Sequence, residues 1–141
     1  MKINVSRIPA EGLQDHATYD PSTMDMERDD IHLREPFDVD ALITKMESEL
    51  VVKADIRCAL RMTCARCLED FSSSLTTDAI FHYKVQSTDV VDITDDVRQE
   101  ILLAYPMFPV CQPDCKGLCG ICGQNLNMTL CSHYIAEHQN R

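Results

Sequence analysis

Closely spaced cysteine pairs constrain this chain more than any other feature of its sequence. Cys119 and Cys122 form one such pair, with Gly120 between them and Gly123 directly after. A C-x-x-C pair in a tight turn presents two sulfurs to one point, which is half of the tetrahedral ligand set that zinc prefers. The two glycines allow a positive φ and a close approach of the backbone. The spacing therefore predicts a structural zinc knuckle.

Four two-ligand units of this kind are present, and together they exceed what one tetrahedral site can use. They are Cys64/Cys67, Cys111/Cys115, Cys119/Cys122 and Cys131/His133. We predict two zinc sites that use all eight ligands. In the favoured pairing the first two units form a site that ties a C-terminal arm to a sheet. The last two units then close a terminal knuckle.

Other ligand sets remain open. The runner-up is a single zinc site made of Cys115, Cys119, Cys122 and Cys131. That choice leaves Cys111 and the Cys64/Cys67 pair as spare thiols. A helical tail would also allow His138 to replace His133. Cys58 lies outside every unit, and we expect it to be a small core residue.

Composition predicts one globular domain with an appended lobe. The chain has 141 residues, of which 45% are hydrophobic and 26% charged. We expect a core domain over residues 1–110 and a cysteine-rich segment over 111–141 packed on it. The N-terminus shows no signal-peptide pattern, and no stretch approaches the roughly 18 apolar residues of a membrane span. A cytoplasmic protein is expected, and in that reducing compartment the cysteines are metal ligands rather than disulfides.

The charge of the chain is negative and unevenly placed. Formal net charge is −10, and residues 11–40 contain ten acidic residues against two basic ones. This predicts an acidic loop at about 11–36. General attraction to nucleic acid is therefore not expected, and any contact with RNA must be local.

Alternating and helical patterns predict an α+β fold. From Leu50 to Cys64 apolar and polar residues alternate, as in a half-buried antiparallel strand, and residues 75–85 repeat this period. Residues 3–8 read as a further short strand. Residues 94–105 predict one main helix capped by Thr94 and ended by Pro106. We expect an antiparallel sheet or partly open barrel with this helix and a C-terminal zinc knuckle.

Enzymatic activity is not expected. Sites filled by four protein ligands leave no position for water or substrate. The sequence contains no Ser/His/Asp arrangement and no glycine-rich phosphate loop. We therefore predict a non-enzymatic protein.

One basic surface is a candidate for RNA contact. It combines Lys53, Arg57 and Arg61, on the outward edge of the predicted strand, with Arg66 on the neighbouring knuckle. Alternate strand residues lie about 6–7 Å apart, which is near the spacing of successive phosphates. The competing interpretation is an ordinary solvated strand face, since Asp55 offsets part of the charge.

An ordered set of motifs over residues 51–133 resembles the YceD family. The motifs are Cys64-Ala-Arg-Cys67-Leu68-Glu69, Ile101-Leu-Leu-Ala-Tyr-Pro106, Pro109-Val110, Asp114-Cys-Lys-Gly-Leu-Cys119, Cys122-Gly123 and Asn125-Leu-Asn127. The resemblance implies a role in accumulation of large-subunit ribosomal RNA and in ribosome biogenesis. It matches Cys64 and Cys67 to the family's central pair, and residues 111–122 to the C-terminal cluster of its cysteine-rich members. Such members usually end in two cysteines, where this chain has Cys131 and His133.

Two other classes of function stay open. A zinc-stapled adaptor could bind a ribosomal protein or an assembly factor through the acidic loop, without touching RNA. A thiol redox protein could instead switch Cys64 and Cys67. Thioredoxin-type chemistry places its cysteine pair at a helix N-terminus, whereas here the pair falls between two predicted strands, which disfavours the redox interpretation.

Overall fold

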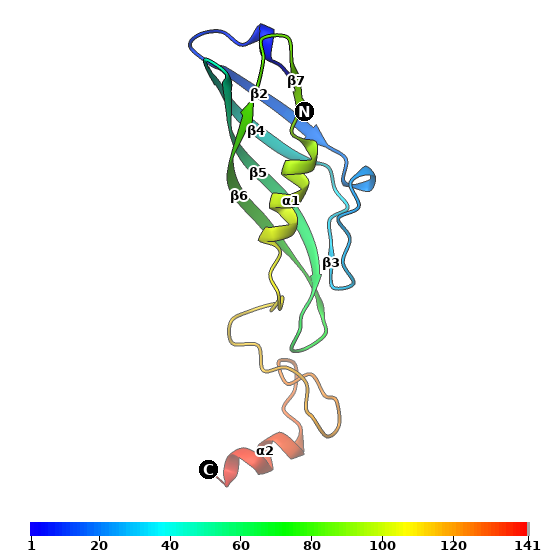
Figure 1. The fold of residues 1–141 in the computed structure, drawn as a ribbon. Helices are drawn as coiled ribbons and strands as arrows, with labels where there is room; N and C mark the ends of the chain where they lie inside the picture. The colour runs from blue at the N-terminus through cyan, green and yellow to red at the C-terminus, as the bar shows by residue number, and fades with distance from the viewer. Residues whose placement is uncertain (141) are drawn as a thin grey trace.

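The computed structural model describes residues 1–140, in which a curled five-stranded antiparallel sheet has a helix on its concave side, a small second sheet, and a C-terminal segment beyond it (Figure 1). The elements are β1 (Lys2–Asn4), η1 (Val5–Arg7), β2 (Leu13–Tyr19), η2 (Pro21–Thr23), β3 (Ile31–His32), β4 (Phe37–Met46), β5 (Glu49–Thr63), β6 (Asp70–Lys84), β7 (Val90–Asp92), α1 (Thr94–Ala104) and α2 (Ser132–Gln139). The predicted α+β class, with an antiparallel sheet and one main helix, is confirmed.

The long hairpin of β5 and β6 organises the sheet. These strands pair antiparallel from Glu49↔Lys84 to Thr63↔Asp70, and the other edge of β5 pairs with β4 and then with β3. β2 extends the sheet by pairing with β4, and β1 with β7 forms a separate two-stranded sheet. β5 is therefore an inner strand over most of its length, and its outward basic residues are on the convex face of the sheet rather than at an edge.

The core lies between the concave face of the sheet and α1. Even-numbered residues of β5 from Leu50 to Met62 are buried, as the alternation predicted. Val97 and Ile101 of α1 are buried against them, and the side-chain hydroxyl of Tyr105 donates to the carbonyl of Met26 at 3.1 Å. Each large aliphatic side chain that is buried here contributes about 1.5–3 kcal/mol.

The predicted acidic loop at 11–36 is wrong for part of its length. Residues 13–19 form β2, paired with β4 from Leu13↔Ile43 to Tyr19↔Phe37. The outward side chains of β2 are polar, while Tyr19 and the following Met24 and Met26 are buried. Of the acidic residues between 11 and 36, only Asp15 lies on β2, and the others lie in the turns and loops around the strands.

Several predicted boundaries also move. The predicted strand at 3–8 ends at Asn4, because η1 follows, and β6 begins at Asp70 rather than after the polar stretch that reaches Ser74. Thr94 is the first residue of α1 and not its cap. Ile93 occupies the N-cap position without a side-chain cap, and the backbone N–H and hydroxyl of Thr94 both donate to Asp92 Oδ1.

The C-terminal segment continues past the turn of the β5–β6 hairpin, with α2 at the far end (Figure 1). Its division from the core at residue 110 stays a prediction. Among residues 1–140, no helix is both long and apolar enough to cross a lipid bilayer.

Candidate metal centres

The first cysteine group joins the turn of the long hairpin to the C-terminal segment. This hairpin group consists of Cys64, Cys67, Cys111 and Cys115, whose sulfurs all lie within 4.8 Å of one another. The Sγ atoms of Cys64 and Cys115 are 3.8 Å apart, and those of Cys67 and Cys111 are 3.7 Å apart. Four sulfurs bound tetrahedrally to one zinc at ~2.3 Å are separated by about 3.8 Å. The spacing of the group therefore fits a zinc ion.

A tight turn holds the first two sulfurs of the hairpin group. The backbone N–H of Leu68 donates to the Cys64 carbonyl at 3.0 Å, and the N–H of Cys64 donates to Glu69 at 2.9 Å. Leu68 has a φ of 61°, a left-handed conformation that costs energy for a residue with a Cβ. Leu68 adopts this conformation in the turn that directs the sulfurs of Cys64 and Cys67 to one point.

Backbone donors surround the buried sulfur of Cys64. The N–H groups of Arg66 and Cys111 each lie 3.4 Å from it. Burial favours the neutral thiol, but these donors and the N–H of Cys67 outweigh burial and lower the pKa of Cys64 to about 6. A thiolate is the form that binds metal.

The same group also contains a thiol that resists ionisation. Burial raises the pKa of Cys111 to about 12, and the neighbouring cysteines add to the rise. Four sulfurs this close cannot all carry negative charge without a compensating cation. A divalent metal reverses this preference, because a coordinated thiol is deprotonated outright. The donor set therefore suits a thiophilic dication.

Arg66 fastens the hairpin turn to the loop that carries Cys115. Its guanidinium Nη1 donates to the carbonyls of Pro113 and Cys115, both at 3.3 Å. On the other side, Gly117 is buried with a φ of +74°, and a Cβ there would lie 3.1 Å from the Arg66 carbonyl oxygen. Only glycine fits this position without displacing the turn.

The second group closes the C-terminal segment on itself. This terminal group consists of Cys119, Cys122, Cys131 and His133, with ligand atoms again within 4.8 Å of one another. Cys119 is buried, whereas Cys122 and His133 are exposed. α2 begins at Ser132, so its first turn presents His133 beside Cys131.

The Cys119 knuckle repeats the arrangement seen at Cys64. The N–H groups of Cys122 and Ile121 lower the pKa of Cys119 to about 6, and the Ile121 nitrogen lies 3.5 Å from its sulfur. Gly123 has a φ of +75°, and its N–H donates to the Cys119 carbonyl at 2.9 Å. The positive φ expected of this glycine is present.

Cys115 and His138 do not lie where the alternative ligand sets require them. Cys115 lies in the hairpin group, away from the single-site set that the sequence left open. The ring of His138 stacks on Tyr134 with centroids 4.0 Å apart, and its Nδ1 lies 3.0 Å from the Tyr134 carbonyl oxygen. Cys58 faces the core, where burial raises its pKa to about 11.

Sequence reasoning gave no role to one residue that contacts a candidate ligand. Asn127 Nδ2 donates to the sulfur of Cys115 at 3.2 Å, and this hydrogen bond is the main cause that lowers the pKa of Cys115. The only signal in the sequence was its place in the Asn125-Leu-Asn127 motif.

One of the candidate RNA-contact residues, Arg57, lies among carboxylates. Lys53, Arg57 and Arg61 are exposed on the convex face of the sheet, and Arg57 forms an ion pair with Asp40. Pairing places Asp40 opposite Asp55, and Asp55 opposite Asp78 on the next strand. The outward side of β5 is therefore mixed in charge rather than basic.

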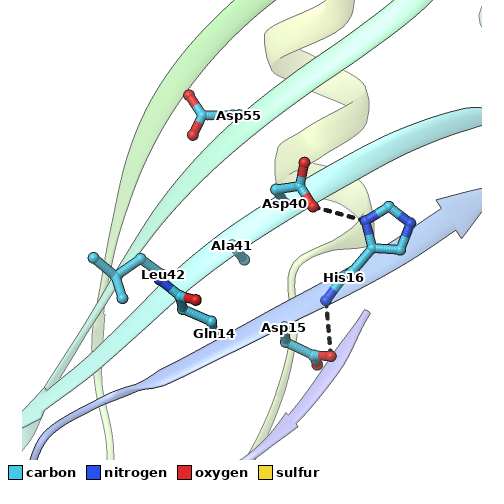
Figure 2. Close-up of a pocket in the computed structure, with 7 residues that line it drawn as sticks. All are labelled: Gln14, Asp15, His16, Asp40, Ala41, Leu42 and Asp55. Atoms are coloured by element: carbon cyan, nitrogen blue, oxygen red, sulfur yellow. Dashed lines mark hydrogen bonds and ion pairs between the residues drawn. The ribbon is translucent and has the colours of Figure 1, made fainter.

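The convex face also has a shallow depression, shown in Figure 2, in the acidic part of the sheet. It is lined by Gln14, Asp15, His16, Asp40, Ala41, Leu42 and Asp55. The Nδ1 of His16 lies 2.7 Å from Asp40 Oδ1, and this hydrogen bond raises the pKa of His16 above its usual 6.5. This surface presents hydrogen-bond acceptors and negative charge to solvent.

Comparison with known proteins identifies relatives of the chain. Residues 81–141 match the family described as large ribosomal RNA subunit accumulation protein YceD. A maize protein described as large ribosomal RNA subunit accumulation protein YCED homolog 1, chloroplastic, is 36% identical over 63 residues, which cover 45% of this chain and 21% of the maize protein.

Mycobacterial proteins match over a longer range. An uncharacterized protein of Mycobacterium tuberculosis is 28% identical over 143 residues, which cover 87% of this chain and 69% of the relative. One from Mycobacterium leprae is 27% identical over 107 residues, which cover 64% and 49% of the two chains. No solved structure matches significantly. The match over residues 81–141 and the likeness to the maize protein support assignment of the chain to the YceD family.

Proposed function

We propose that this protein is a zinc-binding, non-enzymatic factor that supports the accumulation of large-subunit ribosomal RNA in the cytoplasm. The hairpin group carries the proposal, because it joins the sheet to the segment that matches the family. Cys111 and Cys115 lie within the matched residues 81–141, and Cys64 and Cys67 come from the hairpin outside it. The metal would fix the family-specific segment on the core.

The chemistry of the ligands favours zinc. One group offers four sulfurs and the other three sulfurs and an imidazole, which are both common structural zinc sets. Each set completes a tetrahedron with protein atoms alone. The role we assign to the metal is therefore to hold structure, and no catalytic step is proposed.

The convex face favours a protein as the direct partner. Asp40, Asp55 and Asp78 lie side by side across three strands, among the residues that were candidates for RNA contact. Carboxylates repel a phosphate backbone and attract basic side chains. A basic ribosomal protein or assembly factor fits this charge better than RNA does.

A test of the cellular role uses cells that lack the gene. Complementation with the wild type should restore the amount of large-subunit ribosomal RNA relative to small-subunit RNA. The Cys64→Ser/Cys67→Ser double variant should fail to restore it at equal protein level. Cys58→Ala is the matched control, since it changes a buried cysteine outside both groups. Full restoration by the double variant would refute the role assigned to the hairpin group.

A second test separates a protein partner from RNA. Affinity capture from lysate, with and without nuclease, should recover the same partner in both samples. In parallel, filter binding to ribosomal RNA fragments compares the wild type with a variant in which Arg57, Arg61 and Arg66 are each changed to Glu. Binding by the wild type that the triple change abolishes would instead establish RNA contact by the basic residues.

Metal analysis in reducing buffer addresses the redox alternative. Firmly bound, stoichiometric zinc would occupy the thiolates of Cys64 and Cys67 and remove them from exchange chemistry. A metal-free protein with a reversible Cys64–Cys67 disulfide would support the redox function instead.

A further inference from the structure

Asn127 connects the two cysteine groups. It lies in the loop between Cys122 and Cys131, which are both members of the terminal group. Its side-chain amide nevertheless donates to Cys115 Sγ, at 3.2 Å, in the hairpin group. A loop framed by ligands of one site thus supplies a hydrogen bond to a ligand of the other.

The orientation of the Asn127 amide is set by its surroundings. Its Oδ1 accepts from the backbone N–H of Lys116 at 2.8 Å and from the side chain of Gln112 at 3.4 Å. A backbone N–H can only donate, so the oxygen must face Lys116 and the NH₂ group must face the sulfur. The second N–H of that group donates to Asn125 Oδ1 at 3.1 Å. All four hydrogen-bonding positions of the side chain are used.

The loop holds Asn127 in place through its own main chain. The N–H of Leu126 donates to the Gly117 carbonyl at 2.9 Å, and the N–H of Asn127 donates to Asn125 Oδ1 at 3.0 Å. Leu126 is buried beside these bonds. Metal binding at the terminal group would fix both ends of the loop, because Cys122 and Cys131 would share one ion.

We infer that Asn127 is a positioning residue that couples the two metal sites. Occupation of the terminal group orders the loop, and the ordered loop places an N–H donor on the Cys115 thiolate of the hairpin group. This inference rests on the zinc binding proposed above. By linkage, metal in the hairpin group favours metal in the terminal group to the same extent.

The hydrogen bond matters because of the charge at the hairpin group. Four thiolates around one zinc carry a net charge of −2, and a donated N–H disperses part of it. Partners outside the ligand shell typically change metal affinity by about 10–100-fold when they are removed. We expect a change of about 10-fold or more for the loss of Asn127.

The test uses two substitutions that add the same charge two residues apart. Asn127→Asp keeps an acceptor for Lys116 but cannot donate to Cys115. Asn125→Asp keeps the oxygen that accepts from Asn127, so it is the matched control. With purified two-metal protein, chelator competition should show about 10-fold weaker binding at the hairpin group for Asn127→Asp. Asn125→Asp should be close to the wild type.

Cobalt(II) substitution gives a readout that a general folding defect does not imitate. Loss of a hydrogen bond raises the energy of the sulfur lone pairs, so the sulfur-to-cobalt charge-transfer band of the hairpin group should shift to lower energy. This shift is expected in Asn127→Asp and in Asn127→Ala, which adds no charge. Equal spectra and equal affinities in all four proteins would overturn the inference.

Coupling is tested by removing the terminal group. Cys119→Ser/Cys122→Ser should weaken metal binding at the hairpin group in the wild-type background, and much less when Asn127→Ala is already present. An equal effect in both backgrounds would show that Asn127 does not couple the sites. A wild-type protein that binds no metal would instead refute the proposed function.

Discussion

The backbone N–H of Ala65 donates to the carbonyl of Pro109 at 2.7 Å, which joins the turn of the long hairpin to the chain just before Cys111. Pro109 is buried, and Val110 packs against the cysteines of the hairpin group. This main-chain hydrogen bond therefore already fixes the path on which the C-terminal segment leaves the core. Metal at the hairpin group would fasten the next residues of the same path.

Removing the first two sulfurs should release one metal ion and loosen the segment. In Cys64→Ser/Cys67→Ser we expect zinc to fall from two ions per chain to one by elemental analysis, because only the terminal group keeps its ligands. Limited proteolysis should cut faster after residue 110, since fewer attachments remain there. Cys58→Ala should keep both ions. One ion in the wild type, unchanged by the double substitution, would contradict the two-site model.

Gly117→Ala should destabilise the metal-bound protein. A Cβ at this position would meet the Arg66 carbonyl oxygen at 3.1 Å on a backbone with a φ of +74°. A left-handed conformation costs a residue with a Cβ about 1–2 kcal/mol, and the contact adds to this cost. Gly120→Ala is the control, because open space surrounds that position. Thermal unfolding of the two-metal protein should show a lower midpoint for Gly117→Ala alone.

The pKa of His16 should depend on Asp40. Their hydrogen bond raises the pKa of His16 above 6.5, so an NMR titration should find a higher value in the wild type than in Asp40→Asn. Asp78→Asn, which removes the same charge two strands away, should leave the titration nearly unchanged. The folded-state pKa of His16 is raised above its unfolded value of 6.5. The interaction therefore contributes fully to the free energy of unfolding below pH 6.5, and this contribution is lost as pH rises through the folded-state pKa.

The pH dependence of the free energy of unfolding tests the same interaction between His16 and Asp40. The difference in free energy of unfolding between the wild type and His16→Gln should be larger at about pH 5.5 than at about pH 8.5. The effect should be small, since the His16 side chain is 54% exposed. A difference that grows with rising pH would contradict the assignment.

Tyr105→Phe should destabilise the core by about 1–3 kcal/mol. The Tyr105 hydroxyl donates to the carbonyl of Met26 in a buried setting, and the substitution leaves that carbonyl without its partner. Denaturant unfolding measures the change. Tyr134→Phe, on the partly exposed α2, should change the free energy of unfolding by less than about 0.5 kcal/mol.

Periodic segments could be predicted because their pattern reflects their own burial. Ala54, Ile56 and Cys58 alternate with charged or small residues, and that alternation is what a strand with one covered face requires. β2 could not be found in this way. Its side chains from Gln14 to His16 are exposed and polar, and it is a strand because its backbone pairs with β4.

The sequence by itself determined which residues can act as metal ligands, because thiolates and imidazole in pairs of this spacing are a local property. Only the tertiary structure decided how the pairs combine. Cys64 and Cys111 are far apart along the chain and meet because the hairpin turn contacts the segment after Pro109. The contact between Asn127 and Cys115 likewise depends on the fold of a loop, since a side-chain donor finds a distant acceptor only after the main chain is in place.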